Sequence, residues 1–413
     1  MKIALLGYGK ESQATEQYFK NHFANVEIDI FENFTYDEIK TKDFNSYDFV
    51  FRSPSVPPLH LLNETSITKY FFDHCPCQII GVTATKGKGT TCSLIKSLLD
   101  SLHQDAYLVG NIGVPAIDVL DQLTKDSVVV YEMSSFQLWD LEKSPHIAVI
   151  GHIEPDHLNV HRDYDDYLNA KSNICRYQST NDYCIYYSKN PESLKLAETS
   201  KARKIPYPFI IPDDIKSAIT LPGKHNQENA IAAIAAVAAH QNLSPNEFLQ
   251  AHQAGIITGL SNFHGLPHRL EFLRELNGVK YYDDNFSTNP SSTRVAINAF
   301  PNDSLIVIIG GRDKTNYADL PEIYDILKSP AVKKIILLGE SGHELAKQYH
   351  DDRFRLVNTL SAAITAAQLE AEAITSSGHG TVVLMSPAAA SFDMFKNVYD
   401  RGDQFKNLIA SLS

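Results

Sequence analysis

A glycine-rich turn holds the residues of this chain that are best suited to phosphate chemistry. It runs from Gly81 to Thr91 and contains the pair Gly87-Lys88. An apolar segment precedes the turn and apolar residues at helical spacing follow it, which predicts a strand, a turn and a helix start. Backbone N–H groups and the positive end of the helix would then face one point, where Lys88 adds a positive charge. The pattern favours nucleotide binding over an ordinary turn.

The turn departs from the Walker pattern at one position. That pattern places Ser or Thr directly after Gly-Lys, where the hydroxyl binds magnesium. This chain has Gly89 there, followed by Thr90 and Thr91. The hydroxyl that usually binds magnesium is therefore displaced to Thr90 or lost.

Glu132 is a candidate magnesium ligand. It follows residues 127–131, an apolar run that predicts a buried strand. An acid at the end of such a strand, next to a phosphate loop, is where magnesium is normally held. The alternative is a solvated strand end, and the neighbouring loop favours the metal.

Histidines cluster after the next predicted strand, residues 147–150. His157 and His161 stand four residues apart, a spacing that can bind zinc on one helix face. However, no carboxylate lies between them as in the protease motif, and Pro155 disfavours a continuous helix. We therefore prefer a role for His157 beside a hard cation to a zinc site.

Two further polar residues stay open on spacing alone. Lys171 lies in a predicted helix over residues 164–174, and a lone helical lysine usually faces solvent. Asn226 precedes the alanine-rich helix 230–239, whose small side chains allow close packing. It is either a helix cap or a contact to a base.

The elements that position these residues alternate between strands and helices, which predicts an α/β fold with parallel sheets. The first strand, residues 2–6, leads into Gly7-Tyr8-Gly9. That turn is half of a dinucleotide fingerprint, and a packing turn is as compatible with it as a phosphate contact. Arg52 follows the third strand and is either a phosphate ligand or a surface arginine.

The chain divides into three predicted domains, residues 1–76, 77–264 and 265–413. The last one has four predicted strands that each end in small or polar residues, so polar groups should collect at one edge of another parallel sheet. These strands span residues 279–282, 305–309, 334–338 and 381–385.

Composition narrows the function classes. The 413 residues are 43% hydrophobic and 21% charged, with a formal net charge of −12. Net acidity argues against nucleic-acid or acidic-membrane partners. The five cysteines have no zinc or thioredoxin spacing and are expected to be reduced, with Cys92 in a helix core. With no signal segment and no apolar membrane span, we expect a cytoplasmic protein.

Taken together, the motifs resemble the Mur ligases of bacterial cell-wall synthesis, and within them the branch that adds D-glutamate. The resemblance covers nearly the whole chain. The matching motifs are Gly87-Lys88 with Thr90-Thr91, Gly110-Asn111-Ile112-Gly113, Glu132 to Leu138, Pro155 to Leu158, Lys171, His225-Asn226 with Asn229, Gly265 to Arg269, Ser386 to Asp393 and Arg401 to Phe405.

The resemblance implies three domains: a Rossmann-like first domain for a UDP-sugar, a central ATPase-like domain, and a Rossmann-like last domain for ATP and an amino acid. The implied reaction is amide formation. ATP phosphorylates the carboxylate of UDP-N-acetylmuramoyl-L-alanine, and the amine of D-glutamate attacks the acyl phosphate. ATP and Mg²⁺, with two ions expected, are the implied cofactors, and a monomer is expected.

The resemblance also implies site residues. Lys88 would contact the terminal phosphates, Glu132 one magnesium and His157 the second, with Thr90 as a further metal ligand. Lys171 matches a lysine that carries a carbamate. The implied ATP-binding residues are Thr85, Lys86, Gly87, Lys88, Gly89, Thr90, Thr91, Asn229, His268, Arg269 and Asp284. The implied substrate-binding residues are Gly9, Lys10, Ser12, Asn111, Ser134 and Gln137 for the UDP-sugar, and Thr288, Lys314, Ser391 and Phe392 for the amino acid.

Several positions depart from the family pattern. Ala84 replaces a loop glycine, Lys86 an asparagine, Gly89 the magnesium hydroxyl, His152 an asparagine and Phe286 a lysine. Phe286 leaves open a ligase for another amino acid, such as L-glutamate. Ala84 and Gly89 leave open a nucleotide-binding relative without catalysis.

Overall fold

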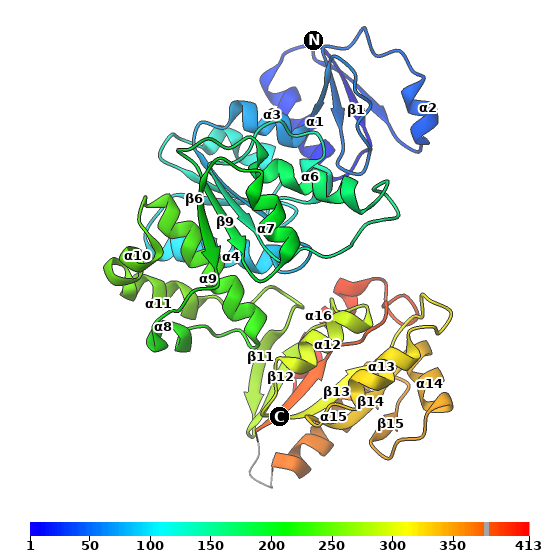
Figure 1. Ribbon diagram of the computed structural model, residues 1–413. Helices are drawn as coiled ribbons and strands as arrows, with labels where there is room; N and C mark the ends of the chain where they lie inside the picture. The colour runs from blue at the N-terminus through cyan, green and yellow to red at the C-terminus, as the bar shows by residue number, and fades with distance from the viewer. Residues whose placement is uncertain (376–379, 413) are drawn as a thin grey trace. The chain divides into compact units, whose positions relative to one another are not determined.

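The structure is a computed structural model that describes residues 1–375 and 380–412. It contains three β-sheets, of four, six and six strands. The chain forms two compact units: residues 1–219 with 225–263, and residues 220–224 with 264–413. Figure 1 shows the first two sheets in blue to green and the third in yellow-green to red.

The first sheet is parallel throughout, with strand order β2-β1-β3-β4. The strand predicted at residues 2–6 is confirmed as β1, whereas β4 was not predicted. The strands of the sheet are β1 (Lys2–Leu6), β2 (Glu27–Phe31), β3 (Phe49–Arg52) and β4 (Glu64–Ser66), accompanied by helices α1 (Lys10–His22), α2 (Tyr36–Lys40) and α3 (Ile67–His74).

The central sheet is also parallel, in the order β10-β9-β8-β5-β7-β6. Its strands are β5 (Gln78–Thr83), β6 (Ala106–Gly110), β7 (Val128–Glu132), β8 (Ile147–Ile150), β9 (Tyr183–Tyr187) and β10 (Arg203–Tyr207). Its helices are α4 (Lys88–Ser101), the 3₁₀ helix η1 (Ala116–Gln122), α5 (Ser135–Leu138), α6 (Tyr164–Arg176), α7 (Pro191–Glu198), α8 (Asp213–Ser217), α9 (Lys224–His240), α10 (Pro245–Ala251) and α11 (Gln253–Asn262).

Both faces of the central sheet are buried, which explains the apolar runs in its strands. Along β7, Val129 and Tyr131 face one core cluster while Val128 and Val130 face the other. The second cluster contains every residue from Ala230 to Ala239 of α9, so the predicted close packing of that helix is confirmed. Cys92 is fully buried in the same cluster, as predicted.

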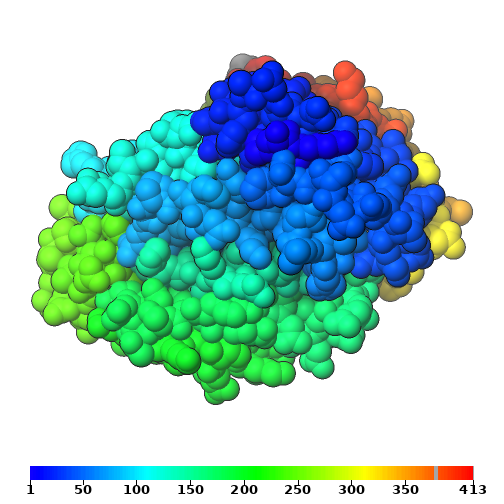
Figure 2. All heavy atoms as spheres, turned by 90° about the horizontal axis from the view of Figure 1, so that it is seen from above, coloured from blue at the N-terminus to red at the C-terminus, as the bar shows by residue number. Residues whose placement is uncertain are grey.

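The first and central sheets share one core cluster. It joins residues of β1, such as Ile3 and Leu5, to residues of η1 and β7. The ring of Phe71 on α3 packs edge-on against Tyr131 on β7, with centroids 5.7 Å apart. In Figure 2 the blue residues of the first sheet lie directly on the cyan residues that follow them. This shared core places both sheets in one unit.

The third sheet has the order β11-β12-β16-β13-β14-β15 and is mixed, not parallel as expected. Strand β11 runs antiparallel to β12 because the two-residue turn Asn277-Gly278 joins them as a hairpin. Both turn residues have positive φ, of 51° and 78°, as such hairpin turns require.

The other strands of the third sheet are parallel. The sheet consists of β11 (Glu271–Leu276), β12 (Val279–Asp283), β13 (Ser304–Ile309), β14 (Val332–Leu337), β15 (Phe354–Leu356) and β16 (Thr381–Met385). Its helices are α12 (Pro290–Asn298), α13 (Leu320–Leu327), α14 (Gly339–Gln348), α15 (Leu360–Thr375) and α16 (Val398–Ala410). Within the described residues of the chain, no helix combines the length and apolar character needed to cross a membrane.

Candidate active site

The glycine-rich turn joins β5 to α4, as the sequence predicted. Gly87 has a left-handed φ of 85°, and a side chain there would lie 2.8 Å from the Oδ1 atom of Asn229. The Lys88 ammonium donates to the carbonyls of Ala84 and Thr85, at 2.9 and 3.3 Å. The loop therefore curls around its own lysine, with Asn229 packed against its glycine.

Glu132 ends β7 and lies in register with Val82 of β5, next to the loop. Its side chain is buried, and one carboxylate oxygen accepts a 2.9 Å hydrogen bond from Asn111. A solvated strand end is therefore excluded. Thr90 is half-buried and Thr91 is buried on the first turn of α4.

Lys171 is only 2% exposed, so a solvated face for this residue is wrong. Its ammonium donates to the Thr83 hydroxyl at 3.1 Å and to the Ala84 carbonyl at 3.0 Å. Burial, reinforced by the nearby Lys88 charge, holds the pKa of Lys171 well below its usual value. Glu132 and Asp156 act in the opposite direction and lie within electrostatic reach. The structure thus gathers Lys88, Glu132 and Lys171 at one edge of the sheet.

The two histidines of the possible zinc pair differ in environment. His157 is exposed and has a positive φ of 55°, and residues 151–163 form no helix, as Pro155 predicted. His161 is buried, and both its ring nitrogens have partners: Nδ1 with Asp166 at 3.2 Å and Nε2 with Ser135 at 2.9 Å. His161 is therefore not arranged as a zinc ligand.

The residues predicted to contact the UDP-sugar are only partly open. Gln137 is buried: its amide oxygen accepts from the Ser134 backbone and hydroxyl, and its amide nitrogen donates to Glu11 at 2.7 Å. Ser12 is buried on α1, whereas Gly9, Lys10 and Asn111 are exposed. Gly7, not Gly9, has the positive φ, of 79°, that the turn after β1 requires.

Arg52 is neither a surface nor a phosphate arginine. It is fully buried and forms ion pairs with Glu64, at 3.2 Å, and with Asp140 of the central part of the chain. A cavity of about 690 Å³ opens beside Asp140. Its walls include Pro57, His60 and Trp139, and none of the predicted substrate residues lines it.

In the second unit, polar residues follow β12 at the predicted edge. Asp284 is buried and accepts from the Leu270 backbone at 3.2 Å and from the Ser386 hydroxyl at 2.8 Å. Burial raises the pKa of Asp284 to about 7. Arg269 is exposed, and its guanidinium lies 5.1 Å from the centre of the Phe286 ring.

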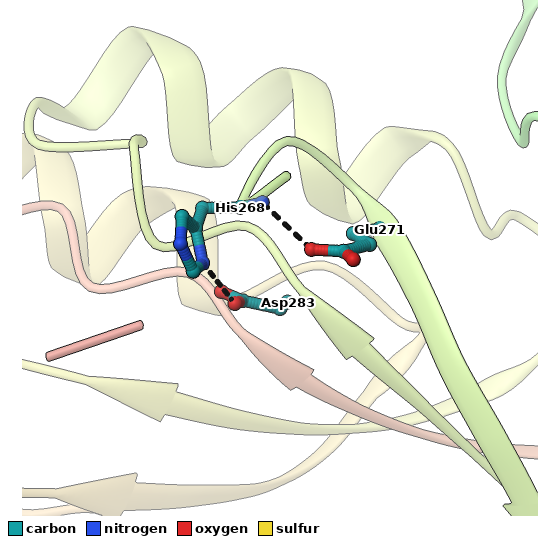
Figure 3. A group of neighbouring side chains, drawn as sticks. All are labelled: His268, Glu271 and Asp283. Carbon is teal, nitrogen blue, oxygen red and sulfur yellow. Dashed lines mark hydrogen bonds and ion pairs between the residues drawn. The ribbon is translucent and has the colours of Figure 1, made fainter. Parts of the chain in front are cut away.

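His268 belongs to a group with the buried Asp283 and the half-buried Glu271, shown in Figure 3. Its Nδ1 pairs with Asp283 at 2.7 Å, and its backbone N–H donates to Glu271 at 2.9 Å. The other carboxylate oxygen of Glu271 binds Lys406 at 2.6 Å. These interactions already occupy the potential metal-binding atoms, so the group fixes His268 and, with it, the neighbouring Arg269.

The predicted amino-acid contacts also lie in the second unit. The Lys314 ammonium donates to the Thr288 carbonyl at 3.0 Å. Burial lowers the pKa of Lys314, and the charge of Arg401 acts in the same direction. Ser391 is buried, and within the described residues its hydroxyl has no partner. Phe392 is 69% exposed.

Each of the two units contains a segment that matches a known protein family. Residues 82–212 match the Mur ligase middle domain, and residues 268–389 match the Mur ligase glutamate ligase domain. A relative from Acetivibrio thermocellus, named UDP-N-acetylmuramoylalanine--D-glutamate ligase, is 32% identical over 90% of this chain and 84% of its own length. One of the same name from Natranaerobius thermophilus is 31% identical over 100% of this chain and 98% of its own.

The chain belongs to the Mur ligase family. The family predicted from the sequence motifs is thereby confirmed, and with it an enzyme of the ligase class. The names of both relatives specify the D-glutamate-adding branch.

Solved structures of Mur ligases share the fold. UDP-N-acetylmuramate-alanine ligase from Thermotoga maritima has a TM-score of 0.59 at 17% identity, covering 100% of this chain and 99% of its own. MurF ligase from the same organism, solved with ADP, has a TM-score of 0.57 at 13% identity, covering 89% and 90%. These neighbours confirm the three-domain α/β architecture.

The structure shows what surrounds three residues of this Mur ligase that depart from the family pattern. Ala84 is buried against Gly151. A Cβ atom at position 151 would lie 2.7 Å from the Ala84 Cβ atom, so glycine there leaves room for Ala84. Lys86 forms a 3.0 Å ion pair with Glu154. Phe286, in place of a lysine, stacks on His268 at 5.9 Å and holds Arg269 over its ring.

Sequence reasoning did not identify several residues that support the site. His161 was considered only as a zinc ligand, and Asp166 and Asp283 were given no role. Asp163, not Asp166, caps the helix, and the contact of Asp166 with His161 depends on how the preceding loop folds. No local pattern could have shown it.

Proposed function

We propose that this Mur ligase joins D-glutamate to UDP-N-acetylmuramoyl-L-alanine, with ATP activating the carboxylate as an acyl phosphate. The observation that carries the proposal is the group Lys88, Glu132 and Lys171 at one sheet edge, beside a phosphate loop. The names of the relatives that match nearly the whole chain support the choice of substrates.

The first step brings together two anions, a carboxylate and a phosphate chain, so the site must neutralise negative charge. The Lys88 ammonium starts from carbonyl partners within its own loop, which the phosphates of ATP would replace. Backbone N–H groups at the start of α4 would bind the same phosphates. Asn229, packed on Gly87, is proposed to contact the adenosine.

Magnesium fits the residues of the central site. Glu132 offers a buried carboxylate and Thr90 a hydroxyl, and oxygen ligands are those that Mg²⁺ prefers. His157 would stand near a second ion. When bound, the ions supply charge neutralisation for the phosphates.

Lys171 has the properties that carbamate formation requires. A lysine must be neutral to add carbon dioxide, and the lowered pKa of Lys171 favours the neutral amine. The product would carry a negative charge in place of a buried positive one. That change would remove the unfavourable interaction with Lys88.

The second unit would deliver the amine. Thr288 and Lys314 are proposed to hold the α-carboxylate of D-glutamate, and the unpartnered Ser391 hydroxyl its side-chain carboxylate. Two carboxylates on one small substrate need separate hydrogen-bond and cation partners. We also propose that the domains end at residues 76 and 264, and that the protein is a cytoplasmic monomer.

The test is a phosphate-release assay across a panel of amino acids with ATP, Mg²⁺ and the UDP-sugar. Release that requires D-glutamate and the UDP-sugar together is expected. Activity with L-glutamate but not D-glutamate would instead favour altered specificity, in keeping with Phe286. ATP binding without amide product from any amino acid would contradict a ligase.

A further inference from the structure

His161 lies near the proposed metal ligands with partners on both ring nitrogens, and the proposed reaction gives it no part. Its side chain is 0% exposed. It packs between the turn that follows Glu132 and the loop that contains His157. A buried histidine that links two functional segments can position both of them.

The first link runs to the turn after Glu132. The Oγ atom of Ser135, three residues beyond Glu132, lies 2.9 Å from the His161 Nε2 atom. On the other side of the ring, Nδ1 lies 3.2 Å from the Asp166 carboxylate. A carboxylate only accepts, so Nδ1 carries the proton and Nε2 accepts the Ser135 hydroxyl. The ring is thus fixed in one orientation.

The second link runs to His157. The backbone N–H of His161 donates to the His157 carbonyl at 3.0 Å, which closes the turn between them. The Phe136 ring stacks on His161, with centroids 5.3 Å apart, and also contacts His157 at 5.0 Å. One aromatic side chain therefore touches both histidines.

We propose that His161 is a positioning residue that binds the Glu132 turn to the His157 loop and so maintains the affinity of the site for divalent metal. This inference rests on the proposed function, because that function makes Glu132 and His157 the metal ligands. Residues that hold metal ligands in place without contacting the metal typically contribute about 10- to 100-fold in metal affinity. We expect an effect of that size for His161.

The test measures Mn²⁺ binding by electron paramagnetic resonance, with a non-hydrolysable ATP analogue present and no UDP-sugar or amino acid. His161→Phe keeps the stacked ring and removes both ring hydrogen bonds. Its Mn²⁺ dissociation constant is expected to rise about 10-fold or more. His161→Gln, whose amide oxygen can accept from Ser135, should recover part of the affinity.

His240→Phe is the matched control, since it replaces another histidine of the same unit at the far end of α9. Its Mn²⁺ affinity should equal that of the wild type. Trp139 is the only tryptophan and its ring lies 4.5 Å from that of His161, so its emission reports whether the surroundings stay folded. Ser135→Ala removes one hydrogen bond alone and serves if His161→Phe does not fold.

Wild-type Mn²⁺ affinity in a folded His161→Phe protein would overturn the inference, as would wild-type affinity in Ser135→Ala if that variant has to replace it. Because no amino acid or UDP-sugar is present, this result is independent of which substrates the ligase joins. A metal-affinity loss with no D-glutamate activity would leave His161 in place and reject only the proposed substrates.

Discussion

The central sheet and the third sheet both collect polar residues where their strands end, but the two edges are built differently. In the second unit the buried His268 is paired with the buried Asp283, and the half-buried Glu271 is paired with Lys406. At the central edge, the hydrogen-bond partners of the buried Lys171 in the described part of the chain are a hydroxyl and a carbonyl, and the charged group that shifts its pKa most is the cation Lys88.

This difference suggests that the paired charges of the second unit hold side chains in fixed positions, whereas Lys171 at the central edge is poised to react. A buried charge with a full set of partners is stable and holds its neighbours in place. A buried lysine beside another cation is destabilising by itself and gains from a reaction or ligand that adds negative charge. We therefore expect substitutions at the central edge to abolish chemistry, and those in the second unit to alter binding and stability.

The sharpest test of this contrast is Lys171→Ala. Phosphate release should fall on the order of 10³-fold, because the charge of the proposed carbamate on Lys171 is lost from the phosphate site. Short carboxylic acids, such as acetate, should restore part of the activity by entering the space left by the side chain. Lys96→Ala, at a half-buried lysine of α4 paired with Asp100, is the control and should leave turnover unchanged.

Removing the Lys171 amine should abolish activity without lowering the stability of the fold. Lys171→Met keeps the side-chain length without the buried amine, so its melting temperature should match or exceed that of the wild type. An active Lys171→Ala protein, or a Lys171→Met protein that unfolds much earlier than the wild type, would show that this lysine is structural.

Lys88→Ala should reduce phosphate release by about 10²–10³-fold, the typical effect of removing one group that stabilises charge in the transition state. The fold should persist, because the hydrogen bonds from the Lys88 ammonium to Ala84 and Thr85 stay within its own loop. Lys96→Ala is again the control, since Lys96 pairs with Asp100 on the same helix, and turnover should stay unchanged. Turnover near the wild-type rate in Lys88→Ala would contradict the phosphate-loop assignment.

The contrast also shows what a sequence reveals. The strand–turn–helix at Lys88 and the acid at the end of β7 are local patterns, so the sequence alone predicts both. Lys171 and Arg52 were misread from local context, because their burial depends on what packs against them from distant segments. The antiparallel β11 was missed although Asn277-Gly278 is a strong hairpin signal. The Ser135–His161–Asp166 chain joins three segments and has no local signature.

A smaller, pH-dependent effect is expected at Asp284. Burial raises the pKa of this carboxyl from 3.8 to about 7. The folded chain therefore keeps a proton that the unfolded chain releases above about pH 4, so this group lowers stability as pH rises toward 7. Between pH 5 and pH 8 the melting temperature of the wild type should fall further than that of Asp284→Asn, by roughly a few degrees. Parallel melting curves across that range would show that Asp284 ionises normally.

The smallest effect is expected at Phe286, where this chain lacks the usual lysine. Its ring holds the Arg269 guanidinium at 5.1 Å, an interaction that is typically worth about 0.5–1 kcal/mol at exposed sites. Phe286→Leu should therefore raise the KM for ATP about two- to five-fold, while kcat stays near that of the wild type. Phe272→Leu is the control, since it removes another partly exposed aromatic residue that packs on Tyr282 instead of Arg269. If Phe286→Leu changed the KM for D-glutamate instead, Phe286 would belong to the amino-acid site, and the second unit would combine binding and specificity at one aromatic residue.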